Sequence, residues 1–213
     1  IRYLILYFTP YGVFCLIAKA TMNFEPESYL ILSKFFVTVI SALLIHVVIF
    51  YSIVLIIFKV NIISHLKGIS TALFVAFSTS SSVATIPVTT RCLIEKLNYK
   101  EEKVNFIIPI GATINMDGTA LFECVVVIFI AQLYGVDLTV IDQFLILFLA
   151  LITSVGVAGI PSASFVAIVV ILGAVGLPFE AVGLILGIDR ILDMLRTSVN
   201  VYGDSCCVSV VSK

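Results

Sequence analysis

Long apolar runs separated by short polar turns set the pattern of the chain. The first run covers residues 1–22 and the second covers residues 29–58, with a polar turn between them. A helix needs about 20 apolar residues to cross a bilayer. The pattern therefore predicts a membrane helix with its loop over residues 1–28, a second helix over 29–60, and a loop over 59–68.

Two later segments begin like membrane helices and are then interrupted. The first, Ser70–Thr90, runs into the consecutive hydroxyl residues Ser78–Ser82 and then a proline. The second, residues 143–179, has no charged residue, is too long for one span and too short for two, and has SVGVAGIPSAS at its middle. Such segments suit a chain that enters the membrane, turns and returns, because protein or water can satisfy the backbone of the turn. We predict re-entrant hairpins over residues 68–96 and 143–173.

Each predicted hairpin is followed by a helix that carries carboxylate and amide side chains. The span over residues 104–134 is interrupted by NMDGT, Asn115–Thr119. An aspartate and a glycine in mid-membrane favour a local unwinding of the helix. An unwound turn frees backbone carbonyls, and carbonyls beside Asp117 are suitable ligands for a small cation.

The last predicted helix covers residues 181–205 and contains DRILDMLRTSVNVYGD. At about 100° per residue, its polar side chains share one stripe roughly 80° wide. That stripe consists of Asp189, Asp193, Arg196, Asn200 and Asp204. Charges inside a membrane cost several kcal/mol each unless they are paired or wetted. The stripe therefore faces protein, ions, water or a ligand.

One interpretation of the stripe is a structural Asp–Arg cluster that clamps helices together, but five polar groups including an asparagine favour a binding site. The two interrupted hairpins with their polar helices also form a repeat, and such repeats indicate a transporter site between the two halves. Half-helices would direct their positive ends at an anionic solute. The carbonyls and carboxylates would hold a cation.

Composition agrees with an all-α, multi-pass membrane protein. The 213 residues are 61% hydrophobic and 12% charged, with a mean hydropathy of +1.23, whereas soluble domains are about a quarter charged. The net charge of -1 gives no indication of a nucleic-acid partner. The five cysteines form no CxxC pair, so we expect small buried apolar residues rather than disulfides or metal ligands. The chain starts at Ile1 without a signal-peptide pattern, and we expect a further amino-terminal part.

Four motifs carry a specific resemblance. SSSVATIP, NMDGTALFE, GVAGIP and DRILDMLRTSVNVYGD, in this order, resemble the dicarboxylate/amino acid:cation symporter family, which contains the glutamate and aspartate transporters. The resemblance implies an elevator-type fold, a homotrimer in the lipid of the plasma membrane, and no enzymatic activity. It also implies a scaffold-type helix within residues 1–28 and a transport core over 29–213. The implied function is sodium-coupled symport of L-glutamate and L-aspartate, with K+ and H+ as further coupling ions.

The resemblance also implies the substrate contacts. Arg196 resembles the arginine that binds the side-chain carboxylate of the substrate, for which a bidentate guanidinium fork is suited. Neutral amino acid members have another residue there, so Arg196 implies acidic substrates. Asp193 resembles the aspartate that receives the substrate ammonium. Further implied contacts are Ser81 and Ser82 at the first hairpin tip, Val155 to Gly159 at the second, and Thr119, Thr197 and Asn200.

Three sodium sites follow from the same resemblance. The first has the Asp204 carboxylate with carbonyls of Gly111, Asn115 and Asn200, the second has Asn115 and Asp117, and the third has Met116 with carbonyls of Thr113, Ser154 and Val155. The third lies beneath the second hairpin, so closure of that hairpin would complete a cation site and couple solute to ion.

Glu123 resembles a glutamate of the proton- and potassium-coupled animal members. A buried carboxyl favours its neutral form, so it could carry a proton; the alternative is a glutamate that only bonds a neighbour. His46 is expected to be a helix-packing hydrogen bonder, and Asp189 and Arg190 are expected to support the helix. The chain departs from the family pattern at Val83, where many members have serine, and at Ser162 and Ser164, where glycines are frequent.

Two other classes deserve comparison. An intramembrane aspartyl protease would pair Asp117 with Asp193 or Asp204, but Arg196 lies one turn from Asp193 and opposes a shared proton. The GxGD motif of such proteases is also replaced by VYGD. A dedicated ion channel would need a ring of like charges, which the sequence does not indicate.

Overall fold

The computed structural model describes residues 26–156, 162 and 164–212, so the predicted first span and Gly159 lie outside the described residues. Within those residues every regular element is a helix. The chain divides into two units, residues 1–37 and residues 38–213, and the site described below lies in the second. Three helical stretches are long and apolar enough to cross a membrane: Leu30–Ile57, Ile62–Thr79 and Glu101–Leu133. The expectation of a multi-pass, all-α membrane protein is thereby supported.

The first of these stretches contains a π-turn. Helix α2 (Pro26–Ile45) continues into the π-helix η1 (His46–Tyr51) and then into α3 (Ser52–Ile57). Hydrogen bonds from i to i+5 are rare and occur mostly as single bulges inside α-helices. The sequence predicts a membrane helix here but not this local change of helix type.

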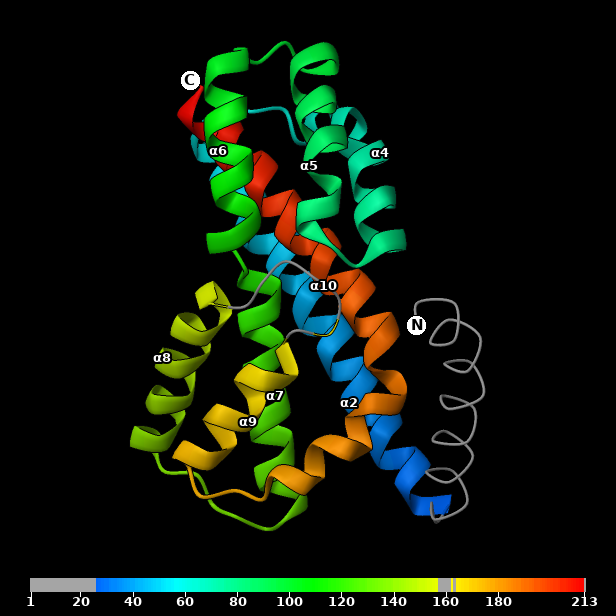
Figure 1. Ribbon diagram of the computed structural model, residues 1–213, viewed down its shortest axis with the longest axis vertical. Helices are drawn as coiled ribbons and strands as arrows, with labels where there is room; N and C mark the ends of the chain where they lie inside the picture. The colour runs from blue at the N-terminus through cyan, green and yellow to red at the C-terminus, as the bar shows by residue number, and fades with distance from the viewer. Residues whose placement is uncertain (1–25, 157–161, 163, 213) are drawn as a thin grey trace, which may run out of the picture. The chain divides into compact units, whose positions relative to one another are not determined.

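The first interrupted segment forms a pair of helices, α4 (Ile62–Thr79) and α5 (Ser82–Arg91), followed by the π-helix η2 (Cys92–Lys96). The two helices pack against each other (Figure 1). Ser80 has a left-handed backbone with φ of 50°, and the Ser81 hydroxyl caps α5 by accepting from the Ala84 N–H at 3.2 Å.

The start of α4 differs from the prediction. The loop was expected to reach residue 68, but Asn61 caps the helix by accepting from the Ser64 N–H.

The second interrupted segment also forms two packed helices, α8 (Val140–Gly156) and α9 (Ser164–Ala174) (Figure 1). Thr139 and Asp142 close a reciprocal cap at the start of α8. The Thr139 hydroxyl accepts from the Asp142 N–H, and the Asp142 carboxylate accepts from the Thr139 N–H. Such a pair satisfies amide groups that a helix start leaves unbonded.

The span is interrupted within NMDGT, but at Asn115 and Met116 rather than at Asp117 and Gly118, the residues on which the prediction rested. Helix α6 (Glu101–Ile114) ends before Asn115, and α7 (Asp117–Leu133) begins after Met116.

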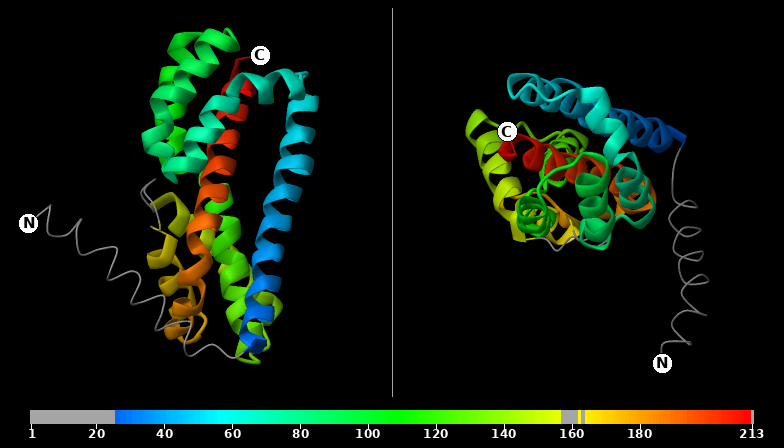
Figure 2. Two further views of the ribbon diagram at one scale, coloured as in Figure 1. Left: turned by 90° about the vertical axis from the view of Figure 1, so that its right-hand side faces the viewer. Right: turned by 90° about the horizontal axis from the view of Figure 1, so that it is seen from above.

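Helix α10 (Val182–Val211), preceded by the short 3-10 helix η3 (Phe179–Ala181), is longer than the predicted 181–205. It packs against α4, α5, α6 and α7 in the second unit, as Figure 2 shows.

The extension of α10 has a partner in α4. His65 is 1% exposed, its Nε2 lies 3.0 Å from the Ser205 hydroxyl, and its Nδ1 lies 3.0 Å from the Ser209 hydroxyl. Because α4 starts earlier and α10 ends later than predicted, this polar contact between the two helices could not be foreseen.

Apolar side chains occupy the outer surface as well as the core. Large apolar side chains point outward, for example Ile141, Phe144 and Phe148 of α8, at 79%, 68% and 61% exposure. Among the described cysteines, Cys92 and Cys206 are buried as expected, while Cys207 is exposed. An outward apolar surface is what a hydrocarbon surrounding favours, and the interior combines an apolar core with buried polar side chains.

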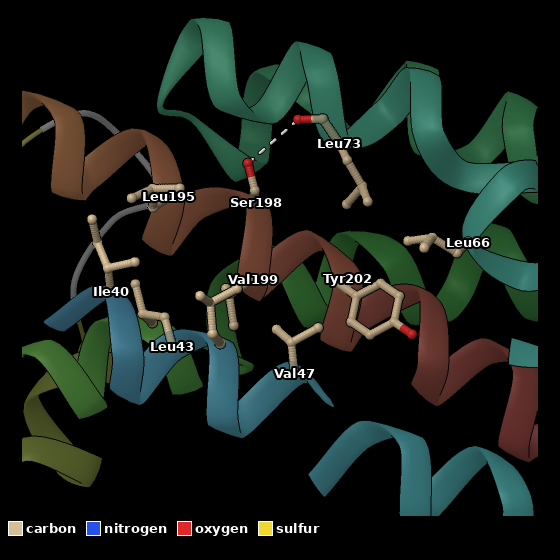
Figure 3. Close-up of a pocket in the computed structure, with 10 residues that line it drawn as sticks. Ile40, Leu43, Val47, Leu66, Leu73, Leu195, Ser198, Val199 and Tyr202 are labelled. Carbon is tan, nitrogen blue, oxygen red and sulfur yellow. Dashed lines mark hydrogen bonds between the residues drawn. The ribbon is translucent and has the colours of Figure 1, made fainter. Parts of the chain in front are cut away.

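One side of α10 borders an apolar pocket of about 190 Å³ shared with α2 and α4. Leu195, Val199 and Tyr202 of α10 line it (Figure 3). The expectation that Leu195 and Tyr202 fill space is consistent with this position. The polar stripe lies elsewhere on the same helix.

Candidate functional site

The polar stripe of α10 is buried along its whole length. Asp189, Asp193, Arg196, Asn200 and Asp204 are all 8% exposed or less. Arg190, which the helical periodicity excludes from the stripe, is exposed. The predicted stripe is confirmed, and its polar groups face protein rather than the outer surface.

Arg196 lies at the centre of the stripe and is only partly paired. Its Nη2 donates to Asp189 Oδ1 at 3.0 Å and to Asp193 Oδ1 at 2.9 Å. Its Cζ lies 3.7 Å from the centroid of the Phe122 ring, a favourable cation–π contact. Its Nε and Nη1 are buried and have no hydrogen-bond partner among the described residues. Unpaired buried donors are costly, so within the described part of the chain the guanidinium has two donor nitrogens open to a ligand.

The two aspartates beside Arg196 also bond the segment between α8 and α9. The backbone N–H of Ser162 donates to Asp193 Oδ2 at 2.9 Å, and its hydroxyl donates to Asp189 Oδ2 at 3.3 Å. Asp189, which was expected to support the helix, bonds Arg196 and Ser162. Ser162 was noted in the sequence only as a departure from the family pattern, and its contact with Asp193 was not predicted.

Asn200 connects α10 to the break between α6 and α7. Its Oδ1 accepts from the Gly118 N–H at 2.8 Å, and its Nδ2 donates to the Thr119 hydroxyl at 3.0 Å. The same Nδ2 lies 3.4 Å from the sulfur of Met116. The structure therefore brings together Met116, Thr119 and Asn200, three of the predicted site residues, and adds the Gly118 amide.

Asp204 lies against α6 just before the break. The Asn115 amide donates to Asp204 Oδ1 at 3.0 Å. A Cβ on Gly111 would lie 2.8 Å from the Asp204 Cγ, so only glycine leaves space for this carboxylate. Gly111, Asn115 and Asp204, predicted to share a cation site, are thus neighbours.

Asp117 has one occupied and one free oxygen. Its Oδ2 accepts from His46 Nε2 at 2.5 Å and from the Tyr51 hydroxyl. Its Oδ1 is buried and has no partner among the described residues. The expectation that His46 is a hydrogen bonder between helices is confirmed, whereas Tyr51 was not singled out by its sequence.

Glu123 is fully buried, at 0% exposure, between α7 and α8. The Thr153 hydroxyl donates to Glu123 Oε2 at 3.0 Å. Its Oε1 has no partner in the described part of the chain. The carboxyl group thus has one bonded oxygen and one oxygen without a partner in the described part of the chain.

The remaining predicted residues are less closely assembled. Thr113 is exposed and its hydroxyl bonds the Ile110 carbonyl of its own helix. Ser154 is buried, and its hydroxyl donates to the carbonyl of Leu151, while Val155 is 47% exposed. No hydrogen bond among the described residues joins these three to Met116, so the third cation site stays a prediction. Ser81, Ser82 and Thr197 are buried.

Among the described residues, no three His, Cys, Asp or Glu side chains are arranged as a metal cluster. The oxygen atoms near the break come instead from isolated carboxylates, an amide and backbone carbonyls. Such mixed oxygen sets suit hard cations.

The chain matches the sodium:dicarboxylate symporter family over residues 1–213. It is 40% identical over 211 residues to a proton/sodium-glutamate symport protein of Bacillus caldotenax, covering 98% of this chain and 49% of that protein. It is 41% identical over 212 residues to an excitatory amino acid transporter of Caenorhabditis elegans, covering 97% of this chain and 42% of the relative. Excitatory amino acid transporter 3 of Oryctolagus cuniculus is 43% identical over 212 residues, covering 99% of this chain and 40% of the relative. The chain therefore spans less than half the length of these relatives. On this match, and with its apolar outer surface and buried polar stripe, the chain belongs to the sodium:dicarboxylate symporter family of integral membrane transporters.

Proposed function

We propose that this chain binds substrate and ions in a sodium-coupled symporter for acidic amino acids, L-glutamate and L-aspartate. The observation that carries the proposal is the buried guanidinium of Arg196, whose Nε and Nη1 have no partner among the described residues. Free guanidinium donors match a carboxylate in charge and hydrogen bonding, and a bidentate contact would pair Nη2 with Nε or Nη1 in place of one aspartate. The names of the relatives, which specify glutamate or excitatory amino acids, agree with such a ligand.

The rest of the substrate is assigned by charge. The α-ammonium would bind Asp193, whose Oδ2 now accepts from Ser162 and whose Oδ1 accepts from Arg196. Asp189 and Asp193 share the single positive charge of Arg196. A substrate ammonium in place of the Ser162 N–H would add the second positive charge that balances the two carboxylates. Ser81 and Ser82 at the tip of α4–α5, with Thr119, Thr197 and Asn200, would contact the α-carboxylate and the backbone of the substrate. The start of α5 supports this role, because a helix amino terminus favours negative charge.

Sodium would bind around the α6–α7 break. Asp204 with Gly111 and Asn115 forms one candidate set, supported by the 3.0 Å contact of Asn115 with Asp204. The free Oδ1 of Asp117 forms a second, and Met116 with Thr113, Ser154 and Val155 a third. Asn200 bonds both the Gly118 amide and Thr119. This one side chain of α10 would therefore contact both the cation at the break and the substrate at Arg196.

We further propose the family's elevator mechanism in a homotrimer, with α4–α5 and α8–α9 as re-entrant hairpins of a core over residues 29–213. The short paired helices and their buried tip serines support the hairpin assignment. Glu123 would carry a proton in one half of the cycle, with K+ as the counter-transported ion. Its complete burial and free Oε1 support a neutral, protonated form.

The protease alternative finds no support in the geometry. A proton-sharing dyad needs two carboxyls in direct contact. Asp193 is instead bonded to Arg196 and Ser162, and Asp117 is bonded to His46 and Tyr51.

Uptake of radiolabelled L-aspartate by the complete chain in proteoliposomes tests the proposal, with sodium outside or choline in its place. We expect uptake that requires sodium and that L-glutamate, but not alanine, suppresses. Equal uptake in both salts would refute sodium coupling. No uptake of any acidic amino acid would reduce Arg196 and Asp193 to a structural ion pair.

A further inference from the structure

The π-turn η1 places two hydrogen-bond donors on the same side of the helix. His46 and Tyr51 are its first and last residues and lie five positions apart. In an α-helix, at about 100° per residue, two such side chains would point about 140° away from each other. In a π-turn the hydrogen bond closes at i+5, so residues five apart lie one above the other. Their rings are accordingly close, with centroids 5.0 Å apart.

Both donors converge on a single atom. His46 Nε2 and the Tyr51 hydroxyl bond Asp117 Oδ2, and an ionised carboxylate oxygen has lone pairs for both. The other oxygen, Oδ1, is buried and unpartnered among the described residues. Two donors on one oxygen fix the rotation of the carboxylate and determine where the second oxygen points.

Aromatic packing holds the donors in place. The His46 ring stacks on Phe50 with 5.1 Å between centroids, and the Tyr51 ring meets the edge of Tyr202 on α10 at 5.3 Å. Stacked and edge-to-face rings are favoured arrangements. Tyr51 is 6% exposed, so its hydroxyl has little freedom to leave Asp117 for solvent.

Gly203 provides the space through which Tyr51 reaches Asp117. A Cβ at this position of α10 would overlap the Tyr51 hydroxyl and lie 2.8 Å from the Tyr51 Cζ. The glycine lies next to Asp204 in the sequence and on the same helix. The contact therefore depends on the π-turn of one helix and on a missing side chain in another.

We propose that His46 and Tyr51 are positioning residues of the cation site, which hold Asp117 Oδ2 so that Oδ1 remains available to sodium. The inference rests on the proposed function, in which Asp117 binds sodium, and adds two residues that do not touch the ion. Oriented ligands held by outer hydrogen bonds are typical of metal sites, and loss of such a bond weakens binding by about 10- to 100-fold.

Sodium binding without amino acid tests the inference directly. The complete chain is purified, and its thermal unfolding midpoint is measured across sodium concentrations at constant ionic strength with choline. Tyr51→Phe removes the hydroxyl and His46→Leu removes the imidazole donor. We expect each to raise the half-saturating sodium concentration about tenfold. At saturating sodium, the KM for L-aspartate should stay near the wild-type value, which separates a positioning role from general damage.

Two controls accompany these variants. Tyr202→Phe removes a hydroxyl from the ring that packs against Tyr51 but leaves every bond to Asp117 in place, so it should keep wild-type sodium affinity. His46→Gln retains an N–H that can donate to the carboxylate, and it should restore much of the affinity that His46→Leu loses. Unfolding midpoints measured in choline alone identify any variant that fails to fold. If Tyr51→Phe or His46→Leu fails to fold, sodium affinity is compared for the one that folds.

The outcomes are distinguishable. Wild-type sodium affinity in both folded variants, Tyr51→Phe and His46→Leu, would overturn the positioning role while leaving sodium coupling intact. Equal losses in Tyr202→Phe would also overturn it, because the effect would then follow from packing. A wild-type protein that sodium does not stabilise beyond choline would overturn the proposed function and the inference together.

Discussion

Replacement of Arg196 gives the sharpest test of substrate selectivity. In Arg196→Cys the two free donors, Nε and Nη1, disappear. A hydrogen bond to a charged group contributes about 1.5–3 kcal/mol, so loss of two such bonds removes about 3–6 kcal/mol from the binding of a side-chain carboxylate. At about 1.4 kcal/mol per factor of ten, this corresponds to a 10²- to 10⁴-fold loss of affinity for L-aspartate.

The substitution has a second effect that must be separated from the first. Asp189 and Asp193 lose the donor they share, Nη2, and removal of one partner from a buried ion pair costs about 3–5 kcal/mol of stability. Arg196→Lys serves as the comparison, because it keeps a positive charge beside the two aspartates but has no planar fork. Arg190→Cys is the matched control, since that arginine is exposed outside the stripe.

The assay is equilibrium binding of labelled L-aspartate, L-glutamate and a small neutral amino acid to the complete chain in sodium. We expect Arg196→Lys to lose both acidic ligands, Arg196→Cys to lose them and gain neutral ones, and Arg190→Cys to bind as wild type. Unchanged affinity for L-aspartate in folded Arg196→Lys would refute the assignment of the fork to the substrate. Equal losses for acidic and neutral ligands would refute it as well, because the effect would not depend on the carboxylate.

Three other substitutions have defined outcomes. Glu123→Gln should abolish proton movement accompanying uptake, measured with a pH dye inside the vesicles, yet keep sodium-dependent substrate binding; proton flux at the wild-type rate would contradict the proton role. Gly111→Ala should raise the half-saturating sodium concentration about tenfold, because overpacking costs about 1–3 kcal/mol and its Cβ would meet the Asp204 carboxylate. Gly173→Ala, whose Cβ would meet nothing within 4 Å, should leave that concentration unchanged. His65→Leu should lower the free energy of unfolding in detergent by about 1–3 kcal/mol, through loss of the contacts between α4 and α10; an unchanged unfolding midpoint would show that they do not stabilise the fold.

Periodicity predicted the features that depend on helical geometry alone. The five-residue polar stripe, the break at Asn115–Met116 and the paired short helices all appear in the structure. The stripe follows because charged groups must be buried on one side of α10, and the break lies in the polar motif, at Asn115–Met116, ahead of the helical Gly118. The sequence therefore contained the framework of the site.

The details that decide hydrogen bonding could not be predicted in the same way. The π-turn at His46–Tyr51 has no local sequence signal, since its residues are as apolar and aromatic as the α-helix around it. The bond from Ser162 to Asp193 joins residues 31 positions apart, and nothing in either segment specifies the pairing. The start of α4 did have a signal, because Asn61 precedes the helix by one residue and bonds Ser64.

The synthesis of α10 after its bonding partners has a consequence for biogenesis. The Gly118 amide, the Asn115 side chain and His65 find their α10 partners 82, 89 and 140 or more positions later in the chain. Until α10 is synthesised and inserted, α4 and the break between α6 and α7 carry polar groups that lipid cannot satisfy. Insertion of α10 would satisfy these polar groups and assemble the site in the same step.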